Sequence, residues 1–388
     1  MKTRFSIPLS PHWHIFGRTY NIFLLLGIVG FLLGSTLGVK LAYLTGLDVV
    51  IAILISVVAA LTFFTFAWLS KLFTGQENII YYRQEIAIVC TTLLVLYSLQ
   101  QPILPYLDLT LLGVGILVCI GRWGCLSAGC CYGKPCSAKV GICYQKTHAQ
   151  RGFPVNYVGV KLWPVPLWES IVLFINISIG VILLLRHYLE GTFTIWYTTT
   201  YGVMRFGFEY LRGDARPYLW HFSEAQWITL GLLSLSSLLA HYGTLPYYAA
   251  HLWITLGLWG VVIGSFLFYR FGDKQWLQLH GAKHLQEIAR GLALLPEQPT
   301  AEVPLLVTSL GLTISYGKIR QATTNLHHYT LSSKNTTYRL TPQTSKQLAE
   351  IIRQLRHSAQ TYQVKFGKKG IVQVIFIEKI EKTNELNS

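Results

Sequence analysis

Residues 107–136 read LDLTLLGVGILVCIGRWGCLSAGCCYGKPC. An apolar run over residues 107–121 gives way here to a stretch rich in Gly and Cys. The run is shorter than the roughly 20 residues that a membrane-crossing helix needs. The sequence therefore predicts a broken or partly buried helix, tolerated where protein or a cavity satisfies its backbone. Arg122 is costly in lipid and should face a cavity or an anionic partner, and a phosphate suits the guanidinium fork.

Long apolar segments on both sides of this stretch define the class of protein. The chain has 388 residues, of which 52% are hydrophobic and 13% charged, about half the charged fraction of a typical soluble domain. The predicted membrane spans are residues 20–44, 48–69, 85–103, 107–121, 165–185, 191–208, 225–241 and 250–269. We therefore expect an all-α polytopic membrane protein, with about seven core transmembrane helices plus one extra.

Positive charge and the N-terminus fit this class. The net charge of +15 is interpreted as Lys and Arg anchors beside anionic lipid. The alternative, nucleic-acid binding, has no basic run or known motif behind it. Lys2 and Arg4 precede an apolar run that begins near Tyr20, and no small-residue cleavage site closes that run. We expect a retained first helix behind an amphipathic lead-in.

Composition changes after Phe271. The chain is expected to divide into a transmembrane core, an additional transmembrane helix and a small soluble α+β domain, at residues 1–241, 242–271 and 272–388. In the last part, the apolar segments 305–317 and 371–379 are typical of strands. Thr341 followed by Pro342 predicts the start of a helix, because Pro fits the first helical position.

A second polar stretch, YGVMRFGFEYLRGDARP, occupies residues 201–217. Steps of three and four residues place side chains on one helical face, and the residues so placed are Tyr201, Arg205, Glu209 and Arg212. Ionisable groups in an apolar helix indicate a functional site. The alternative is a structural Arg–Glu pair, with Arg212 as an interface anchor.

A third stretch, WPVPLWES, begins the fifth span at residues 163–170. Its Glu169 either stabilises the helix N-terminus or belongs to a site. Glycines of the first stretch permit close backbone approach to a ligand, and they are Gly121, Gly124, Gly129 and Gly133.

Five of the seven cysteines crowd the polar loop after the fourth span, at Cys125, Cys130, Cys131, Cys136 and Cys143. Three interpretations stay open. The spacing fits only partly the paired cysteines of zinc sites, disulfides are expected if the loop faces an oxidising compartment, and packing or a reactive thiol is the third interpretation.

These stretches, in this order, resemble the prolipoprotein diacylglyceryl transferase family over roughly residues 5–241. That family has a GRxGNFxNxExxG signature, an HPxQLYE stretch and a YGxxRFxxExxR stretch. The last is matched at every fixed position, by Tyr201, Gly202, Arg205, Phe206, Glu209 and Arg212. The N-terminal segment resembles the family's HWYGLMY region, with Gly17 in place, and Asp108 resembles the aspartate that opens the signature helix.

The signature departs from the family pattern where Asn and Glu are expected. Cys125 and Ala128 replace its two asparagines, and Cys130 replaces its glutamate. Tyr82 stands, by spacing, where the family has a histidine. The resemblance thus implies that the part binding phospholipid is kept, while the part that handles the acceptor or its proton is rebuilt around Cys and Tyr.

The resemblance implies transfer of a diacylglyceryl group from phosphatidylglycerol to the cysteine thiol of a prolipoprotein, releasing glycerol phosphate. Cationic groups must neutralise the leaving phosphate, and the attacking thiol must become a thiolate. The expected catalytic residues are Arg122, Arg205, Glu209 and Tyr82, with Tyr82 or Glu209 as the base. An interfacial aromatic anchor is the alternative for Tyr82. The expected substrate-binding residues are Tyr201, Arg212, Glu169, Gly121, Gly124, Gly133, Cys125 and Cys130.

Two other functions stay open, a phospholipid-dependent transferase with a different acceptor and an inactive scaffold or metal- or redox-binding membrane protein. The retained Arg205 and Glu209 favour an enzyme, whereas the altered signature favours the alternatives. Expected partners are phosphatidylglycerol, a lipoprotein precursor or other thiol acceptor, and the lipid bilayer. We expect no cofactor, no resident metal and no nucleic acid, and a multi-pass position in the bacterial cytoplasmic (inner) membrane.

Overall fold

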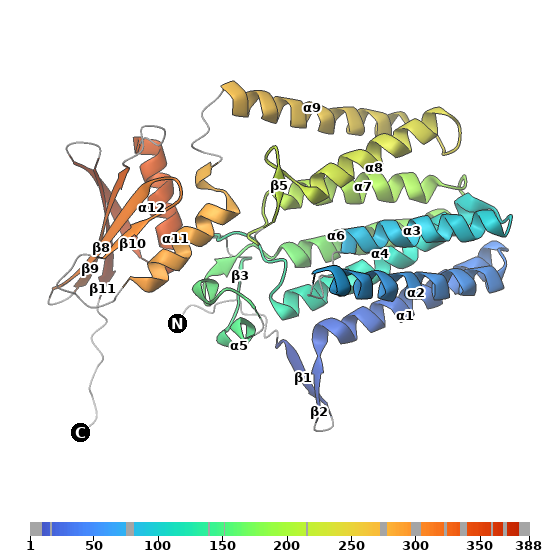
Figure 1. Ribbon diagram of the computed structural model, residues 1–388, viewed down its shortest axis with the longest axis horizontal. Helices are drawn as coiled ribbons and strands as arrows, with labels where there is room; N and C mark the ends of the chain where they lie inside the picture. The colour runs from blue at the N-terminus through green and yellow to red at the C-terminus, as the bar shows by residue number, and fades with distance from the viewer. Residues whose placement is uncertain are drawn as a thin grey trace.

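Long helices lie side by side in the N-terminal part of this computed structural model, and a sheet with helices follows in the C-terminal part (Figure 1). The structure describes residues 10–379 except 16–17, 75–80, 139, 151, 215, 272–277, 296–303, 322–323, 334–339, 358–359 and 368–370. Lys2, Arg4 and Gly17 therefore lie outside the described residues. The long helices are α1 (Ile22–Thr45), α2 (Val49–Thr74), α3 (Tyr81–Ser98), α4 (Ile103–Ala128), α6 (Val165–Leu185), α7 (Thr192–Glu209), α8 (Glu224–His241) and α9 (Ala249–Phe271).

Helix α4 packs against α1, α3, α6 and α7 and is the most buried of the apolar helices. Of the two predicted forms, the broken helix is wrong, because α4 continues to Ala128 and ends at Gly129 with φ 76°. The buried helix is confirmed. Close packing explains why its polar end stays helical. In the middle of α4, a Cβ on Gly34 of α1 would lie 2.6 Å from the carbonyl oxygen of Gly113. At the polar end, a Cβ on Gly124 would lie 3.2 Å from the Cα of Phe23. Helix α1 therefore packs closely on α4 at both places, and Arg122 and Cys125 of the polar end are buried.

Five described helices are long and apolar enough to cross a membrane, namely α1, α2, α4, α6 and α9. This confirms a mostly helical chain with several membrane-spanning candidates, but not the predicted number of core spans. The other three predicted spans form α3, α7 and α8, helices of 18 residues each. Charged residues at their ends, including Glu85 and Glu209, make these helices less apolar.

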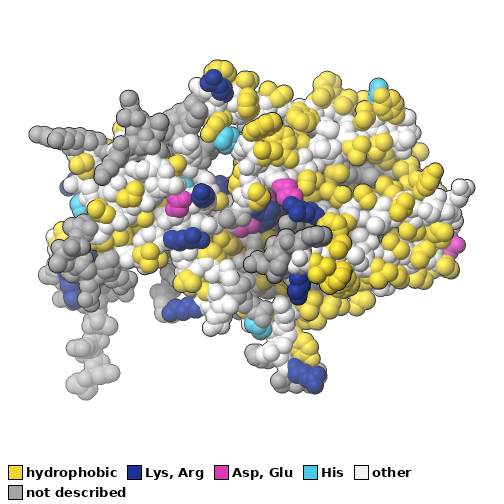
Figure 2. Space-filling model, viewed as in Figure 1, with side chains coloured by type: hydrophobic (Ala, Val, Ile, Leu, Met, Phe, Trp, Pro, Cys, Tyr) yellow, Lys and Arg dark blue, Asp and Glu magenta, His cyan; other side chains and the backbone are white. Residues whose placement is uncertain are grey.

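Large apolar side chains cover the outside of the helices. Leu32, Phe64, Phe174 and Trp253 are each more than half exposed. Figure 2 shows hydrophobic side chains spread over the helical part, while charged side chains gather near its junction with the C-terminal part. Soluble monomers rarely expose apolar surface of this extent, so the distribution fits contact with lipid.

A structured polar segment, residues 129–164, joins α4 to α6. Its elements are β3 (Ile142–Cys143), α5 (Lys146–Ala149), η1 (Val155–Tyr157) and β4 (Lys161–Leu162), with β3 antiparallel to β4. Tyr132 makes edge-on ring contacts with Phe153 and Tyr157, and all three are buried. Two further hairpins precede α1 and α8, formed by β1 (His12–Ile15) with β2 (Arg18–Asn21) and by β5 (Tyr218–Leu219) with β6 (Phe222–Ser223).

The C-terminal part is an antiparallel sheet in the order β10-β11-β9-β8-β7. Its elements are α11 (Ala282–Leu294), β7 (Leu305–Val307), β8 (Leu312–Arg320), β9 (Thr324–Ser333), α12 (Pro342–Arg356), β10 (Thr361–Phe366) and β11 (Val372–Lys379). Thr341 caps α12 by accepting a hydrogen bond from the Thr344 N–H, which confirms the predicted helix start. The predicted strand 305–317 is instead two strands, because a turn with Gly311 at φ 76° separates β7 from β8.

Candidate active site

Asp108 fixes the relation between two helices that carry the candidate site. Its carboxylate on α4 accepts hydrogen bonds from the backbone N–H groups of Gly191 (2.8 Å) and Thr194 (2.7 Å) at the start of α7. These donors are among those that a helix N-terminus leaves unsatisfied, and a negative charge there also complements the helix dipole. The contact holds α7 in a defined position along α4, so that Arg205 lies near Arg122.

Glu169 of α6 is completely buried, and its carboxylate lies near three guanidinium groups. Its Oε2 lies 2.6 Å from Arg122 Nε, and its Oε1 lies 2.6 Å from Arg205 Nη1. Arg212 Nη1 is 3.8 Å from the same Oε1. These ion pairs favour a place in the site over the alternative role at the helix N-terminus.

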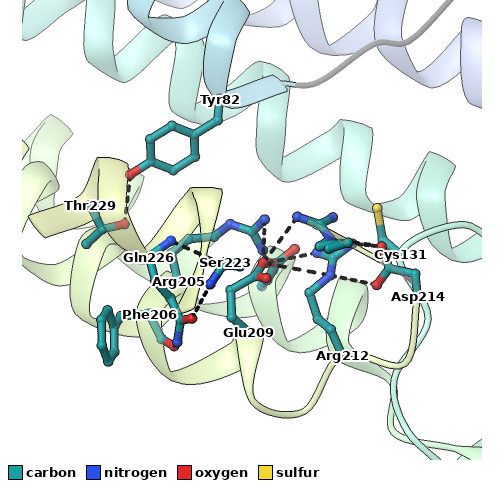
Figure 3. Close-up of polar contacts among 12 residues, drawn as sticks. Tyr82, Cys131, Arg205, Phe206, Glu209, Arg212, Asp214, Ser223, Gln226 and Thr229 are labelled. Carbon is teal, nitrogen blue, oxygen red and sulfur yellow. Dashed lines mark hydrogen bonds and ion pairs between the residues drawn. The ribbon is translucent and has the colours of Figure 1, made fainter. Parts of the chain in front are cut away.

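A second carboxylate extends the network. Glu209 Oε1 lies 2.8 Å from Arg205 Nη2 and 3.3 Å from Arg216 Nη1. Arg212 donates two hydrogen bonds to Asp214, of 2.9 Å and 3.2 Å (Figure 3). We call the connected side chains the arginine–carboxylate cluster, which comprises Arg122, Glu169, Arg205, Glu209, Arg212, Asp214 and Arg216.

Arg212 does not lie on the predicted helical face. Helix α7 ends at Glu209, and Arg212 follows in a bridge with Gly133. Its side chain still reaches the cluster and is fully buried, so the alternative role as an exposed interface anchor is wrong. The prediction erred because the turn after α7 redirects the chain without moving Arg212 away from its partners.

The arginine–carboxylate cluster carries four guanidinium groups and three carboxylates, one positive charge in excess. Arg122, Arg205 and Arg212 are each no more than 4% exposed. Removing one partner of a buried ion pair costs about 3–5 kcal/mol, because the other charge is left without compensation. These charges therefore need one another or an anionic ligand, and the positive excess favours the anion.

Asp214 shows how the arginines act on a group outside the helices. Burial by itself raises the pKa of this carboxyl group, but the guanidinium groups of Arg212 and Arg216 outweigh burial and hold the pKa below its ordinary value. Asp214 therefore stays ionised and serves as a fixed counter-charge for both arginines.

Tyr82 lies in the interior of the bundle rather than at an exposed surface. Its hydroxyl is 2.9 Å from Thr229 Oγ1 of α8, and Figure 3 shows the ring turned toward Thr229. Tyr201 is also buried and stacks on Tyr197, with ring centroids 5.3 Å apart. This hydrogen bond joins Tyr82 to α8, and a catalytic role for Tyr82 stays a prediction.

Sequence reasoning missed several members of this region. Glu85 accepts a hydrogen bond of 3.1 Å from the Tyr197 hydroxyl, next to the stacked tyrosines. It follows Tyr82 by three residues on α3, so helical spacing alone places both on one face. Asp214 and Arg216 lie within the quoted stretch 201–217, but only the fold brings Arg216 back to Glu209 and places Asp214 against Arg212 and Arg216.

Two of the predicted glycines make close contacts within the protein. A Cβ on Gly124 would lie 3.2 Å from the Cα of Phe23, so this glycine lets α1 approach α4. A Cβ on Gly133 would lie 2.5 Å from the Trp163 carbonyl oxygen. Packing accounts for both glycines, and their approach to a ligand stays a prediction, as it does for Gly121, which is buried within α4.

The cysteines of the polar segment separate into two groups. The sulfur atoms of Cys125, Cys130 and Cys131 lie within 4.8 Å of one another, and we call these residues the cysteine trio. Cys136 and Cys143 lie outside the trio. None of the seven cysteines, all within the described residues, forms a disulfide. Cys131, which sequence reasoning did not assign to the site, lies 3.6 Å from Arg122 Nη1, which donates a hydrogen bond to its sulfur.

The C-terminal part touches the same region through α11. Gln286 donates hydrogen bonds to the Tyr132 hydroxyl (3.2 Å) and to the Gly213 carbonyl oxygen (2.9 Å). Tyr132 follows Cys131, and Gly213 follows Arg212. Helix α11 therefore braces both chain segments beside the cluster.

The fold and the site define a helical membrane protein with a buried, positively charged cluster. The cluster lies at the end of the helices where the polar segment is attached. The sequence profile described as prolipoprotein diacylglyceryl transferase matches residues 12–242. This match covers more than half of the 388 residues, and the chain belongs to this family.

Two curated relatives are similar to part of the chain. One is phosphatidylglycerol–prolipoprotein diacylglyceryl transferase 2 of Clostridium perfringens, 31% identical over 137 residues, which are 34% of this chain and 49% of the relative. The other is phosphatidylglycerol–prolipoprotein diacylglyceryl transferase of Clostridium tetani, 31% identical over 128 residues, which are 33% of this chain and 49% of the relative. The chain spans about half the length of the curated relatives it matches.

Proposed function

We propose that this protein transfers a diacylglyceryl group from phosphatidylglycerol to a cysteine thiol of a lipoprotein precursor, with release of glycerol phosphate. The family and the names of the two relatives support this reaction class. The observation that carries the proposal is the convergence of Arg122, Arg205 and Arg212 on Glu169 in a buried cluster with one excess positive charge.

The reaction explains why such a cluster is useful. Attack of a thiolate on the glyceryl carbon forms an S–C bond and breaks the C–O bond, and the electron pair leaves with the phosphate. Negative charge on the phosphate therefore grows in the transition state. Guanidinium groups held in place beforehand stabilise that charge without further reorganisation, which is the role proposed for Arg122 and Arg205. Tyr201 and Arg212 would help to hold the headgroup.

Glu209 is the better candidate for the base. Its Oε1 is occupied by arginines, whereas its Oε2 is buried and has no hydrogen-bond partner among the described residues. That oxygen can accept the thiol proton. The Tyr82 hydroxyl already bonds to Thr229, and a neutral tyrosine is a weak base at neutral pH.

An apolar cavity supports a lipid donor. It has a volume of about 340 Å³ and lies among α1, α2 and α4, with Phe23, Ile55, Val114 and Leu117 in its lining. Phe23 also packs on Gly124, two residues from Arg122. We propose that an acyl chain of the donor occupies this cavity while the headgroup reaches the cluster.

We further propose that α3, α7 and α8 complete the membrane core with α1, α2, α4 and α6. In that arrangement residues 1–241 are the transferase core, 242–271 add the helix α9, and 272–388 form a separate soluble domain. The bacterial cytoplasmic membrane is the proposed location, because phosphatidylglycerol is the proposed donor. A different thiol acceptor is the second candidate, since Cys125 and Cys130 replace residues of the family signature.

Complementation tests the proposal. In a cell depleted of its own diacylglyceryl transferase, the wild-type gene should restore lipid-modified lipoproteins, as measured by mass spectrometry of the modified peptide. Arg205→Ala should lose on the order of a hundred-fold or more, the loss expected when one transition-state donor is removed. Arg83→Ala is the control, because Arg83 is about half exposed and pairs with Glu224. A new lipid adduct on another thiol would indicate the second candidate, and no adduct at all would contradict both.

A further inference from the structure

The end of α4 folds back so that three thiols meet. The N–H groups of Gly129 and Cys130 both donate to the carbonyl oxygen of Cys125, at 3.0 Å and 3.1 Å. Gly129 has φ 76°, and Cys131 has φ 57°, a left-handed conformation that costs energy for a residue with a side chain. This turn brings the sulfur of Cys131 over those of Cys125 and Cys130, within 4.8 Å.

A positive charge lies beside the trio. Arg122 Nη1 is 3.6 Å from the sulfur of Cys131 and donates a hydrogen bond to it. A metal ion binds the thiolate form of cysteine. Three sulfur atoms gathered within 4.8 Å of one another can therefore serve as ligands of one ion.

A second observation lies beside the trio. The Tyr144 side chain is 3% exposed, and its hydroxyl has no hydrogen-bond partner among the described residues. Burial first, and then the nearby charges of Cys130, Cys125 and Cys131, raise the pKa of this hydroxyl. An unsatisfied buried hydroxyl is costly, and water or another ligand bound at the trio would give it a partner.

We propose that Cys125, Cys130 and Cys131 bind one zinc ion and leave a fourth coordination position open. Three protein ligands with one open position are the arrangement of catalytic zinc. Zinc–sulfur bonds of about 2.3 Å place sulfur atoms roughly 3.8 Å apart in a tetrahedron, so the trio needs to close by about 1 Å at most.

The open position borders Arg122 and suits the acceptor thiol, a role that rests on the proposed transferase function. A thiol that binds the ion loses its proton, which Glu209 or water accepts. The sulfur then forms its bond to the glyceryl carbon as the C–O bond breaks, and glycerol phosphate leaves with the electron pair. The zinc ion would thus keep the acceptor as a thiolate in a site whose signature Asn and Glu positions hold cysteine.

Metal analysis tests the site without any lipid. The full chain is purified in detergent under reducing conditions, incubated with Zn²⁺ alone, desalted and measured by mass spectrometry of the elements. We expect about one zinc ion per chain, retained by Cys90→Ser and Cys143→Ser and lost by Cys130→Ser with Cys131→Ser. Co²⁺ in place of Zn²⁺ should give thiolate-to-metal absorption in the wild type, a signal that does not depend on whether the double variant folds.

Three results would overturn the zinc site: less than about one-fifth of an ion per wild-type chain, full zinc in the double variant, or a disulfide within the trio. Transfer assays separate this inference from the proposed function. Zinc binding without any transfer would support the metal site and contradict the proposed reaction. Full transfer by metal-free wild type would support the reaction and contradict the proposed role of zinc in it.

Discussion

In the arginine–carboxylate cluster, acidic and basic side chains neutralise most of one another's charge, whereas the adjacent cysteine trio gathers three sulfur atoms within 4.8 Å of one another. Glu169 and Glu209 each contact at least two guanidinium groups. In the trio, Cys131 accepts a hydrogen bond from Arg122. The first group keeps one positive charge in excess, which suits an anion, and the second offers three sulfur ligands, which suit a metal cation.

The cluster and the trio therefore differ in what they contribute to the stability of the fold and to chemistry. Buried ion pairs rarely stabilise a fold more than apolar packing would, but breaking one is expensive. The cluster therefore resists loss of any member and keeps its charge ready for an anion. The trio contributes little to folding as a set of thiols, so its close geometry and the left-handed Cys131 need a chemical explanation.

The largest effect should follow from Glu169→Gln. Three guanidinium groups lose their shared counter-charge, and the free energy of unfolding should fall by about 3–5 kcal/mol. Thermal unfolding in detergent and the amount of protein in the membrane measure this. Glu224→Gln is the control, because that carboxylate is partly exposed and pairs with the half-exposed Arg83. Equal free energies of unfolding for Glu169→Gln and Glu224→Gln would contradict the larger contribution of the buried cluster.

Asp214→Asn should have a smaller effect that depends on pH. The pKa of Asp214 is below its ordinary value in the folded state, so its contribution is fully present above the ordinary carboxyl pKa and is lost as pH falls through the lower folded value. The variant should lose about 1.5–3 kcal/mol at pH 7, and the gap to wild type should close below about pH 4.

Unfolding curves of wild type and Asp214→Asn across this pH range measure the gap. Glu190→Gln, at an exposed residue, should follow the wild type throughout. A gap that stays constant down to pH 3 would show that Asp214 acts through packing rather than charge.

Cys131→Ser tests the other side of the comparison. The serine hydroxyl is a poor zinc ligand, so zinc should be lost and the transfer rate should drop on the order of tenfold, while unfolding changes little. Cys143→Ser provides the matched control in the same polar segment. A strong loss of stability with unchanged metal content would assign the trio to packing.

The smallest effect is expected for Tyr82→Phe. The variant loses one buried hydrogen bond to Thr229, worth about 1 kcal/mol, and transfer should fall less than about threefold. A loss of a hundred-fold or more is the range for removal of a general base and would restore Tyr82 to the catalytic residues. Mutation of Thr229→Val tests the same bond from its other end.

Apolar runs made most helices predictable, but the course of α4 was not. A short run followed by Gly and Arg suggested a break, whereas packing of Gly34 on Gly113 and of Phe23 on Gly124 keeps α4 helical to Ala128. Tertiary contacts therefore stabilise a helical conformation that the local sequence does not predict. The helix start at Thr341 was readable because its cap is local. The turn at Gly311 was hidden inside an otherwise continuous apolar segment.

The site was predictable where its members repeat at helical spacing or match a motif. Arg122, Arg205 and Glu209 do indeed meet in one network through Glu169. Arg216 reaches Glu209, and Asp214 reaches Arg216, only through the turn after α7. Cys131 joins its neighbours through a left-handed backbone conformation that no spacing rule encodes.

Release of glycerol phosphate tests the central claim most directly. The purified chain is placed in phosphatidylglycerol vesicles with a cysteine-containing lipoprotein-precursor peptide, and released glycerol phosphate and the lipidated peptide are quantified by mass spectrometry. We predict equal amounts of both products from wild type and Arg83→Ala, and at least about a hundred-fold less from Arg205→Ala. No product from wild type, or undiminished product from Arg205→Ala, would contradict the proposal that the arginine–carboxylate cluster drives phospholipid-dependent transfer.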